Sequence, residues 1–161
     1  MSAIASFIKV PKSALDGLRK AAVPQKRLFG GSKDTYHDYL REHGHEIADY
    51  RWSGFVLATL LPYLQEKHQI DLMRSEYDEL AAFLTKARKA THFILTRAQA
   101  SAFLSRLDPR LFSEGEMRQY FNEFNATDDQ KVGQAMLDGV VAFQESLKQM
   151  EDESVVVFNI G

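Results

Sequence analysis

The chain has 161 residues, of which 45% are hydrophobic and 26% are charged, a composition typical of one soluble globular domain. It contains no Cys, which excludes disulfides, thiol nucleophiles and cysteine-based metal sites. The formal net charge of −2 excludes a polybasic nucleic-acid-binding protein.

The first fifty residues are predicted to contain a strand, two helices and a loop. Residues 3–10 are rich in Ile, Phe and Val and alternate weakly, which favours a strand. Ser13 is expected to cap a short helix that runs to about Ala22, and the Pro- and Gly-containing stretch 23–34 is expected to form a loop. Apolar side chains at three- and four-residue spacing then predict a helix over about 35–50.

The remainder of the chain alternates helices with two further strands. Helical periodicity continues over residues 52–64 and reappears over about 72–89. The stretches 91–95 and 155–160 consist mainly of β-branched, aromatic and aliphatic residues. Such residues are favoured in sheets, so both stretches are predicted to be strands.

Three capping-box patterns place helix starts in the second half of the chain. Thr96, Ser113 and Thr127 each stand three positions before a Gln or Glu, the spacing at which the two side chains can cap backbone N–H groups. These patterns predict helices that begin near residues 97, 114 and 128. Three aromatic side chains of the second of these helices are interpreted as core because of their helical spacing: Tyr120, Phe121 and Phe124.

We therefore predict a single domain, residues 1–161, with an α+β, mostly helical fold. About six helices are expected to pack on a small sheet that includes the N-terminal and C-terminal strands. Two strands alone form a marginal sheet, so the pairing of residues 3–10 with 154–160 requires support from the helices.

Four short segments stand out as a set: Ser2–Ala22, Asp49–Trp52, His92–Gln99 and Val155–Gly161. Together they resemble the YfbM-like family of uncharacterised bacterial proteins, whose Asp-x-Lys-Trp segment and Leu-Thr-Pro-Glu-Glu helix start are similar to the second and third. That family carries a Gly- and Pro-rich segment after the Trp-containing helix, whereas Gln65–Ala90 is charged and contains neither residue. The resemblance implies the fold and carries no activity, because the family has none assigned.

One candidate metal site lies in the helix predicted over residues 35–50. Glu42, His45 and Asp49 are separated by three and four positions, so a helix would place them on one face together with Asp38. The run from His45 to Asp49 differs by one residue type from the His-Glu-x-x-His pattern, in which two side chains bind zinc and the Glu activates water. A metal-dependent hydrolase is therefore one alternative, and a solvated acidic helix face is the other interpretation.

Two aromatic residues suggest a small-ligand site as a further alternative. Trp52 is interpreted as core by default, but it could also line a groove, with a ligand pocket near Trp52 and Phe55. The sequence contains no Gly-x-Ser-x-Gly elbow and no dinucleotide-binding fingerprint, so no cofactor is expected. The run Gly30–Lys33 lacks the spacing of a phosphate-binding loop and is interpreted as a flexible connection.

Charge is distributed unevenly along the chain. Residues 1–33 hold seven basic residues against one acidic residue, a net charge of +6, which leaves −8 for residues 34–161. Residues 108–161 contain 11 acidic and 4 basic residues, a net charge of −7. Either the two ends attract each other within the fold, or the acidic segment steers a basic partner at short range. The expected partner-binding residues are Glu116, Glu123, Asp128 and Asp129.

These features together predict a non-catalytic cytoplasmic interaction protein, such as an immunity protein that inhibits a basic toxin through an acidic face. The expected partner is a protein rather than nucleic acid or a membrane. The N-terminus lacks the basic start and long apolar core of a secretory signal. The longest apolar run, Phe55–Leu64, is shorter than the about 20 residues that a membrane-spanning helix needs.

Overall fold

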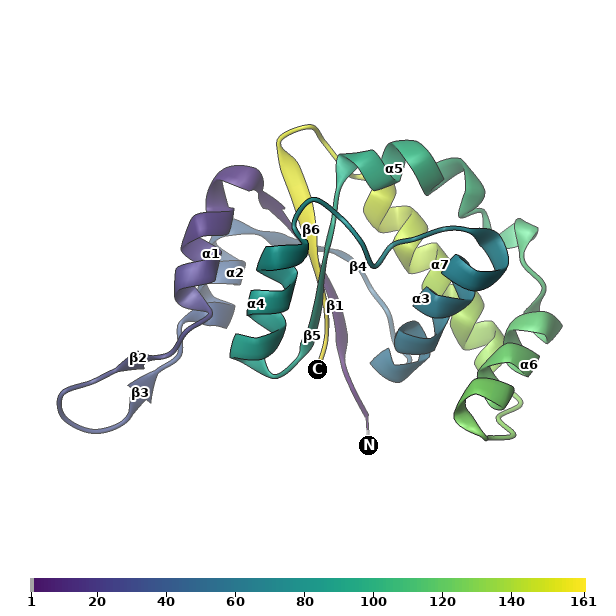
Figure 1. Ribbon diagram of the computed structural model, residues 1–161, viewed down its shortest axis with the longest axis horizontal. Helices are drawn as coiled ribbons and strands as arrows, with labels where there is room; N and C mark the ends of the chain where they lie inside the picture. The colour runs from purple at the N-terminus through teal and green to yellow at the C-terminus, as the bar shows by residue number, and fades with distance from the viewer. Residues whose placement is uncertain (1) are drawn as a thin grey trace.

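The computed structural model describes residues 2–161. Within this range the chain forms seven α-helices and a four-stranded antiparallel sheet. Helices α1, α2 and α4 cover one face of the sheet, and α3, α5, α6 and α7 cover the other (Figure 1). The predicted α+β, mostly helical fold is confirmed, and its layers are helices, sheet and helices.

The sheet has the strand order β4-β1-β6-β5. Its strands are β1 (Ala5–Pro11), β4 (His45–Ala48), β5 (Thr91–Leu95) and β6 (Ser154–Ile160). The terminal strands β1 and β6 pair along their whole length, as the sequence predicted, and β6 also pairs with the whole of β5. Strand β6 is therefore an inner strand with hydrogen-bonded neighbours on both sides.

Alternate side chains of β6 enter two different hydrophobic cores. Val156, Phe158 and Ile160 pack against α3 and α7, whereas Val155 and Val157 pack against α1, α2 and α4. All five side chains are buried. Because helices cover both faces, the strand carries a continuous apolar run instead of alternating apolar and polar residues.

Phe158 lies at the centre of the larger core. Its ring stacks on Phe7 of β1 with 4.6 Å between ring centroids and on Phe93 of β5 at 5.9 Å. Phe143 meets Phe158 edge-on at 5.2 Å from α7. Three strands and the longest helix are thus joined through one aromatic side chain, in the offset and edge-to-face arrangements that aromatic rings favour.

The smaller helical layer begins directly after β1. Its helices are α1 (Leu15–Ala21), α2 (Tyr36–His43) and α4 (Asp78–Arg88). The expectation that Ser13 caps α1 is wrong, because a short 3-10 turn over Lys12–Ala14 precedes the helix and the cap residue Ala14 has no side-chain acceptor. Leu15 and Leu18 are buried on the side of α1 that faces the smaller core.

In the larger helical layer, two of the three predicted capping patterns form hydrogen bonds at a helix start. Its helices are α3 (Gly54–His68), α5 (Arg97–Phe103), α6 (Glu114–Asn125) and α7 (Val132–Lys148). Thr96 forms the predicted capping box, and Ser113 accepts a hydrogen bond from the Glu116 N–H. Thr127 caps nothing, because its hydroxyl donates to Asn122 and α7 begins five residues later.

The helix predicted over residues 35–50 is in fact a helix followed by a strand. Helix α2 ends at His43, and Gly44 continues in an extended backbone. A Cβ atom on Gly44 would lie 2.7 Å from the Lys9 carbonyl oxygen of β1, so the two backbones meet too closely for any other residue. Residues 45–48 then form the edge strand β4 against β1.

The helix predicted over about 72–89 also starts later than expected. Ile70 and Leu72 are buried in irregular backbone, and α4 begins only at Asp78. The Asp78 carboxylate accepts from the Ser75 N–H, and the Ser75 hydroxyl accepts from the Tyr77 N–H. These two hydrogen bonds satisfy backbone donors at the helix start.

Residues 23–34, expected as a loop, contain a small hairpin. Strands β2 (Gln25–Lys26) and β3 (Ser32–Lys33) pair antiparallel and project from the end of the molecule at α1 (Figure 1). Gly30 and Gly31 both adopt positive φ angles, of 78° and 85°. Only Gly adopts this conformation without strain, which explains the Gly pair at the turn.

A polar network that runs from exposed Asp34 to buried His92 lies at the base of this hairpin. Arg88 of α4 donates to both carboxylate oxygens of Asp34, at 3.0 and 2.7 Å, and its guanidinium lies over the Tyr36 ring. The Tyr36 hydroxyl lies 2.9 Å from His92 Nε2, and His92 Nδ1 lies 2.7 Å from the Ala90 carbonyl oxygen. Because a carbonyl only accepts, Nδ1 carries the proton and the Tyr36 hydroxyl donates to Nε2.

Burial sets the protonation states of this pair. His92 is only 3% exposed, and burial lowers its pKa by more than the hydrogen bond to the Ala90 carbonyl raises it, while the charges of Arg88 and His37 lower the pKa further. Burial also raises the pKa of Tyr36 to about 12. The folded protein therefore favours neutral His92 and neutral Tyr36.

This network predicts a stability loss in mild acid. The unfolded chain binds a proton at His92 near the ordinary pKa of 6.5, but the folded protein does so only at lower pH. The free energy of unfolding, measured with urea between pH 8 and pH 5, should therefore be highest above pH 6.5 and fall below it. His92→Gln should make this decline shallower, whereas substitution of the exposed His45 should not.

Removal of the Tyr36 hydroxyl provides the matching test at pH 8. Tyr36→Phe leaves the buried Nε2 of His92 unpaired, so the free energy of unfolding should fall by about 1–3 kcal/mol. A wild-type pH slope in His92→Gln, together with unchanged stability in Tyr36→Phe, would contradict this account of the network.

Candidate functional site

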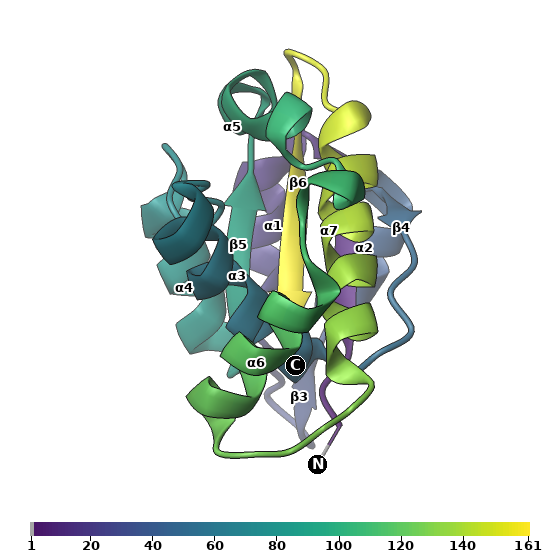
Figure 2. The same cartoon turned by 90° about the vertical axis from the view of Figure 1, so that its right-hand side faces the viewer.

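The four acidic residues predicted to bind a partner lie together at one end of the molecule. Glu116 and Glu123 belong to α6, and Asp128 and Asp129 belong to the connection between α6 and α7. All four are exposed, and α6 and this connection form the end of the molecule that faces the viewer in Figure 2. We call these four residues the acidic surface.

No residue of the acidic surface forms an ion pair with any residue in the range 2–161. Acidic residues nearer the C-terminus behave differently. Glu151 pairs with Lys9 at 2.9 Å, and Glu145 pairs with Lys148 at 3.4 Å. Ion pairs therefore neutralise part of the negative charge of the C-terminal third in α7 and just before β6, whereas none forms at the acidic surface.

Asn122 fixes the shape of the connection that carries the two aspartates. Its side-chain oxygen accepts from the Asp129 N–H and from the Thr127 hydroxyl, both at 2.8 Å. Its side-chain amide donates to the Asp129 carbonyl at 3.1 Å. Asp129 in turn accepts from the Lys131 N–H just before α7. Asn122 was not among the residues predicted from the sequence, because nothing in its spacing distinguishes it from an ordinary polar helix residue.

An exposed aromatic side chain lies on α6, the helix that carries Glu116 and Glu123. Phe124 is 58% exposed, next to Glu123, and its ring stacks on Tyr120 at 5.9 Å. The interpretation of Phe124 as core is wrong, because the side chain is exposed on the last turn of α6, which ends one residue later. Tyr120 and Phe121 are partly buried against the larger core.

Glu116 connects the acidic surface to a half-buried aromatic cluster. It accepts from the Tyr63 hydroxyl at 3.4 Å, and His68 Nε2 lies 3.2 Å from the same hydroxyl. Burial, reinforced by the charge of Glu116, raises the pKa of Tyr63 to about 12. Burial lowers the pKa of His68. The Tyr120 hydroxyl donates to Glu66 at 2.9 Å, which brings a further carboxylate to this side of α6.

Of the two aromatic residues proposed to bind a small ligand, Trp52 lines a groove. This groove of about 480 Å³ lies between the segment after β4 and α7. The indole N–H of Trp52 donates to Asp138 at 2.7 Å, and Asp138 also accepts from Gln134. Phe55 is exposed at the start of α3 and does not line the groove.

The geometry proposed for a metal site does not form. Glu42 lies in α2, His45 begins strand β4, and Asp49 follows the strand, so the three share no helix face. Four residues of extended chain span about 13 Å, whereas a helix would place His45 and Asp49 one turn apart. Asp49 pairs with Arg51 at 3.1 Å. Among residues 2–161, no three His, Asp or Glu side chains are grouped closely enough to hold a metal ion.

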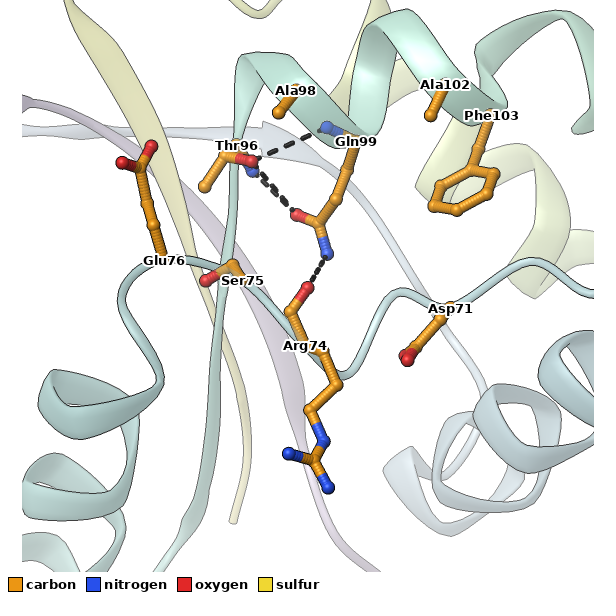
Figure 3. A pocket seen from close by; sticks show the side chains of 9 residues that line it. All are labelled: Asp71, Arg74, Ser75, Glu76, Thr96, Ala98, Gln99, Ala102 and Phe103. Atoms are coloured by element: carbon orange, nitrogen blue, oxygen red, sulfur yellow. Dashed lines mark hydrogen bonds between the residues drawn. The ribbon is translucent and has the colours of Figure 1, made fainter.

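A further pocket of about 510 Å³ lies between the segment before α4 and helix α5 (Figure 3). The Gln99 amide donates to the Arg74 carbonyl at 2.9 Å, and its oxygen accepts from the Thr96 N–H at 2.8 Å. Gln99 thus ties the pocket's two walls together, and its polar atoms are already paired. The Asp71 and Glu76 carboxylates and the Arg74 guanidinium supply the pocket's charges (Figure 3).

Comparison with protein-family models, with curated proteins and with solved structures finds no match. Over the described residues, the helices are all too short or too polar to cross a bilayer. The geometry of the chain itself is therefore the basis for a functional proposal.

The role of Asn122 generates a prediction for this surface. Asn122→Ala removes three hydrogen bonds that shape residues 127–129, so the free energy of unfolding should fall by about 1–2 kcal/mol. Amide hydrogen exchange should accelerate locally over residues 126–131. Glu123→Gln is the matched control on the same helix and should stay within about 0.5 kcal/mol of wild type. Unchanged exchange in Asn122→Ala would show that other contacts hold the connection.

Proposed function

We propose that this protein is a cytoplasmic interaction protein that binds a basic protein partner through the acidic surface. The observation that carries the proposal is that Glu116, Glu123, Asp128 and Asp129 form no ion pair in the described residues and that Phe124, on the same helix as two of them, is exposed. Charge at the rim and an aromatic side chain at the centre are the usual composition of a protein-binding surface.

The two components of the surface have different roles in binding. Exposed carboxylates attract a basic partner over about one Debye length and raise the association rate. Phe124 supplies apolar area that a partner removes from water, which slows dissociation. Asn122 and the packing of α6 on α7 hold these groups in place before binding, so little ordering is required when the partner arrives.

The most specific form of this proposal is an immunity-type inhibitor. Proteins that act on nucleic acid carry basic surfaces, and an acidic surface can cover such a surface by charge complementarity. Inhibition of this kind requires no catalytic residue in the inhibitor. The resemblance to YfbM-like proteins remains a separate proposal and adds no activity to this one.

A charge-neutralising variant tests the proposal. Affinity capture from the native host, with the captured partner then purified, supplies the binding pair. A variant that combines Glu123→Gln, Asp128→Asn and Asp129→Asn keeps the shape of each side chain and removes three charges. We expect its affinity, measured by calorimetry at low salt, to fall at least tenfold and its salt dependence to become weaker.

A matched variant distinguishes an effect of the acidic surface from an effect of the protein's net charge. Glu145→Gln combined with Asp152→Asn and Glu153→Gln removes three charges elsewhere in the C-terminal third, two of them ion-paired, and should bind as wild type does. Phe124→Ala should increase the dissociation rate. Equal affinity of the two charge variants for the partner would refute binding through the acidic surface.

A further inference from the structure

The basic end of the chain forms a surface that the proposed function does not use. From residue 17 to residue 33 the sequence contains five Lys or Arg residues and no Asp or Glu. Three of these cations, Lys26, Arg27 and Lys33, are exposed on the hairpin of β2 and β3. None of the three pairs with a carboxylate in the described residues. We call residues 25–33 the basic hairpin.

The tip of the basic hairpin consists of two large apolar side chains. Leu28 is 98% exposed and Phe29 is 94% exposed, so the rest of the protein covers almost none of either side chain. They are followed directly by Gly30 and Gly31, whose positive φ angles turn the chain back. An apolar tip is thus presented on a narrow projection, with cations on both sides of it along the chain.

The apolar surface continues at the base of the hairpin. A shallow groove of about 590 Å³ is lined there by Val23, Pro24 and the ring of Phe83, with Arg19 and Lys20 beside them. The Arg19 guanidinium lies 4.3 Å from the centre of the Phe83 ring. The tip and the base of the hairpin therefore share one feature, which is that exposed apolar side chains lie next to cationic side chains.

We propose that the basic hairpin binds the surface of an anionic lipid bilayer, with Leu28 and Phe29 inserted into the interface. Apolar side chains that enter the headgroup region, together with cations that meet anionic lipids, are the two components of peripheral membrane binding. This proposal revises the sequence-based expectation of no membrane contact. A surface-bound hairpin requires no helix that crosses the bilayer.

Geometry favours a bilayer over a folded protein as the occupant. A specific protein interface buries about 800 Å² on each partner, and a hairpin of two-residue strands offers little flat area of its own. A narrow apolar tip would need a deep, matching pocket in a protein partner. A fluid lipid interface adapts to any convex tip, so the same two side chains suffice there.

The distribution of charge also fits this orientation. The basic hairpin and the acidic surface lie at opposite ends of the longest axis of the molecule, which is horizontal in Figure 1. An anionic bilayer attracts the basic hairpin and repels the acidic surface. The protein would therefore bind with the hairpin facing the lipid. The acidic surface would then point away from the lipid and stay accessible.

Vesicle flotation with purified full-length protein tests the proposal. Vesicles of phosphatidylcholine with 30% phosphatidylserine should bind the protein, and pure phosphatidylcholine vesicles should bind it far less. Leu28→Ser with Phe29→Ser should weaken binding at least tenfold. Each neutralised cation among Lys26, Arg27 and Lys33 should weaken it about fivefold at low salt.

Two controls make the result specific to the hairpin. Leu111→Ser with Phe124→Ser removes two exposed apolar side chains elsewhere, and Glu123→Gln with Asp128→Asn alters the acidic surface. Both variants should bind vesicles as wild type does, so failure here is distinguishable from failure of the partner-binding proposal. Phe29→Trp should add fluorescence emission that shifts to shorter wavelength on anionic vesicles.

Three outcomes would overturn the proposal. The first is no binding to anionic vesicles, and the second is equal binding by wild type and by Leu28→Ser with Phe29→Ser. The third is self-association in solution that the same double variant abolishes without any vesicle binding, which would assign the hairpin to a second copy of the chain.

Discussion

The pairing of β6 with β1 on one side and β5 on the other is the constraint on which the rest of the structure depends. These strands come from the two ends and the middle of the chain, so the sheet closes only when the last residues are in place. Phe158 of β6 then joins Phe7, Phe93 and Phe143 in one cluster. Because β6 is apolar on both faces, helices must cover the sheet twice, which gives the three layers.

This arrangement explains how a chain with a net charge of only −2 can be strongly polarised. One of the N-terminal cations, Lys9, meets Glu151 across the β1–β6 region, so part of the charge is neutralised within the fold. The basic hairpin and the acidic surface are held apart instead, at the two ends of the longest axis (Figure 1). The sheet and its helices lie between two surfaces of opposite charge. Each surface can therefore bind a partner without the other.

Local patterns predicted the elements whose formation depends on local chemistry. The strands near residues 3–10, 91–95 and 155–160 and the capping box at Thr96 are found where the sequence placed them. The prediction of one helix over residues 35–50 was wrong, because a tertiary contact determines where the helix ends. The approach of Gly44 to the Lys9 carbonyl ends α2, and β1 takes the next residues as an edge strand. The spacing of apolar residues in the sequence does not predict that contact.

The candidate sites also divide into features that depend on local sequence and features that depend on tertiary contacts. Glu116, Glu123, Asp128 and Asp129 lie close in sequence, on α6 and the connection that follows it, although the sequence pattern predicted a helix start near residue 128 instead of this connection. The metal site required a helix face that does not exist, and Phe124 was assigned to the core because periodicity says nothing about where a covering element ends. The basic hairpin was seen as a charged loop, but its exposed apolar tip depends on the three-dimensional path of the chain.

Native-state hydrogen exchange measured at increasing urea concentration tests the central role of β6 most directly. If the sheet closes through β6, its amides exchange only when the whole protein unfolds, and their exchange free energy equals that of global unfolding. Residues 25–33 should exchange with almost no protection, since their hairpin has only two-residue strands. Exchange of the β6 amides through a smaller opening, while α6 and α7 stay protected, would contradict this account.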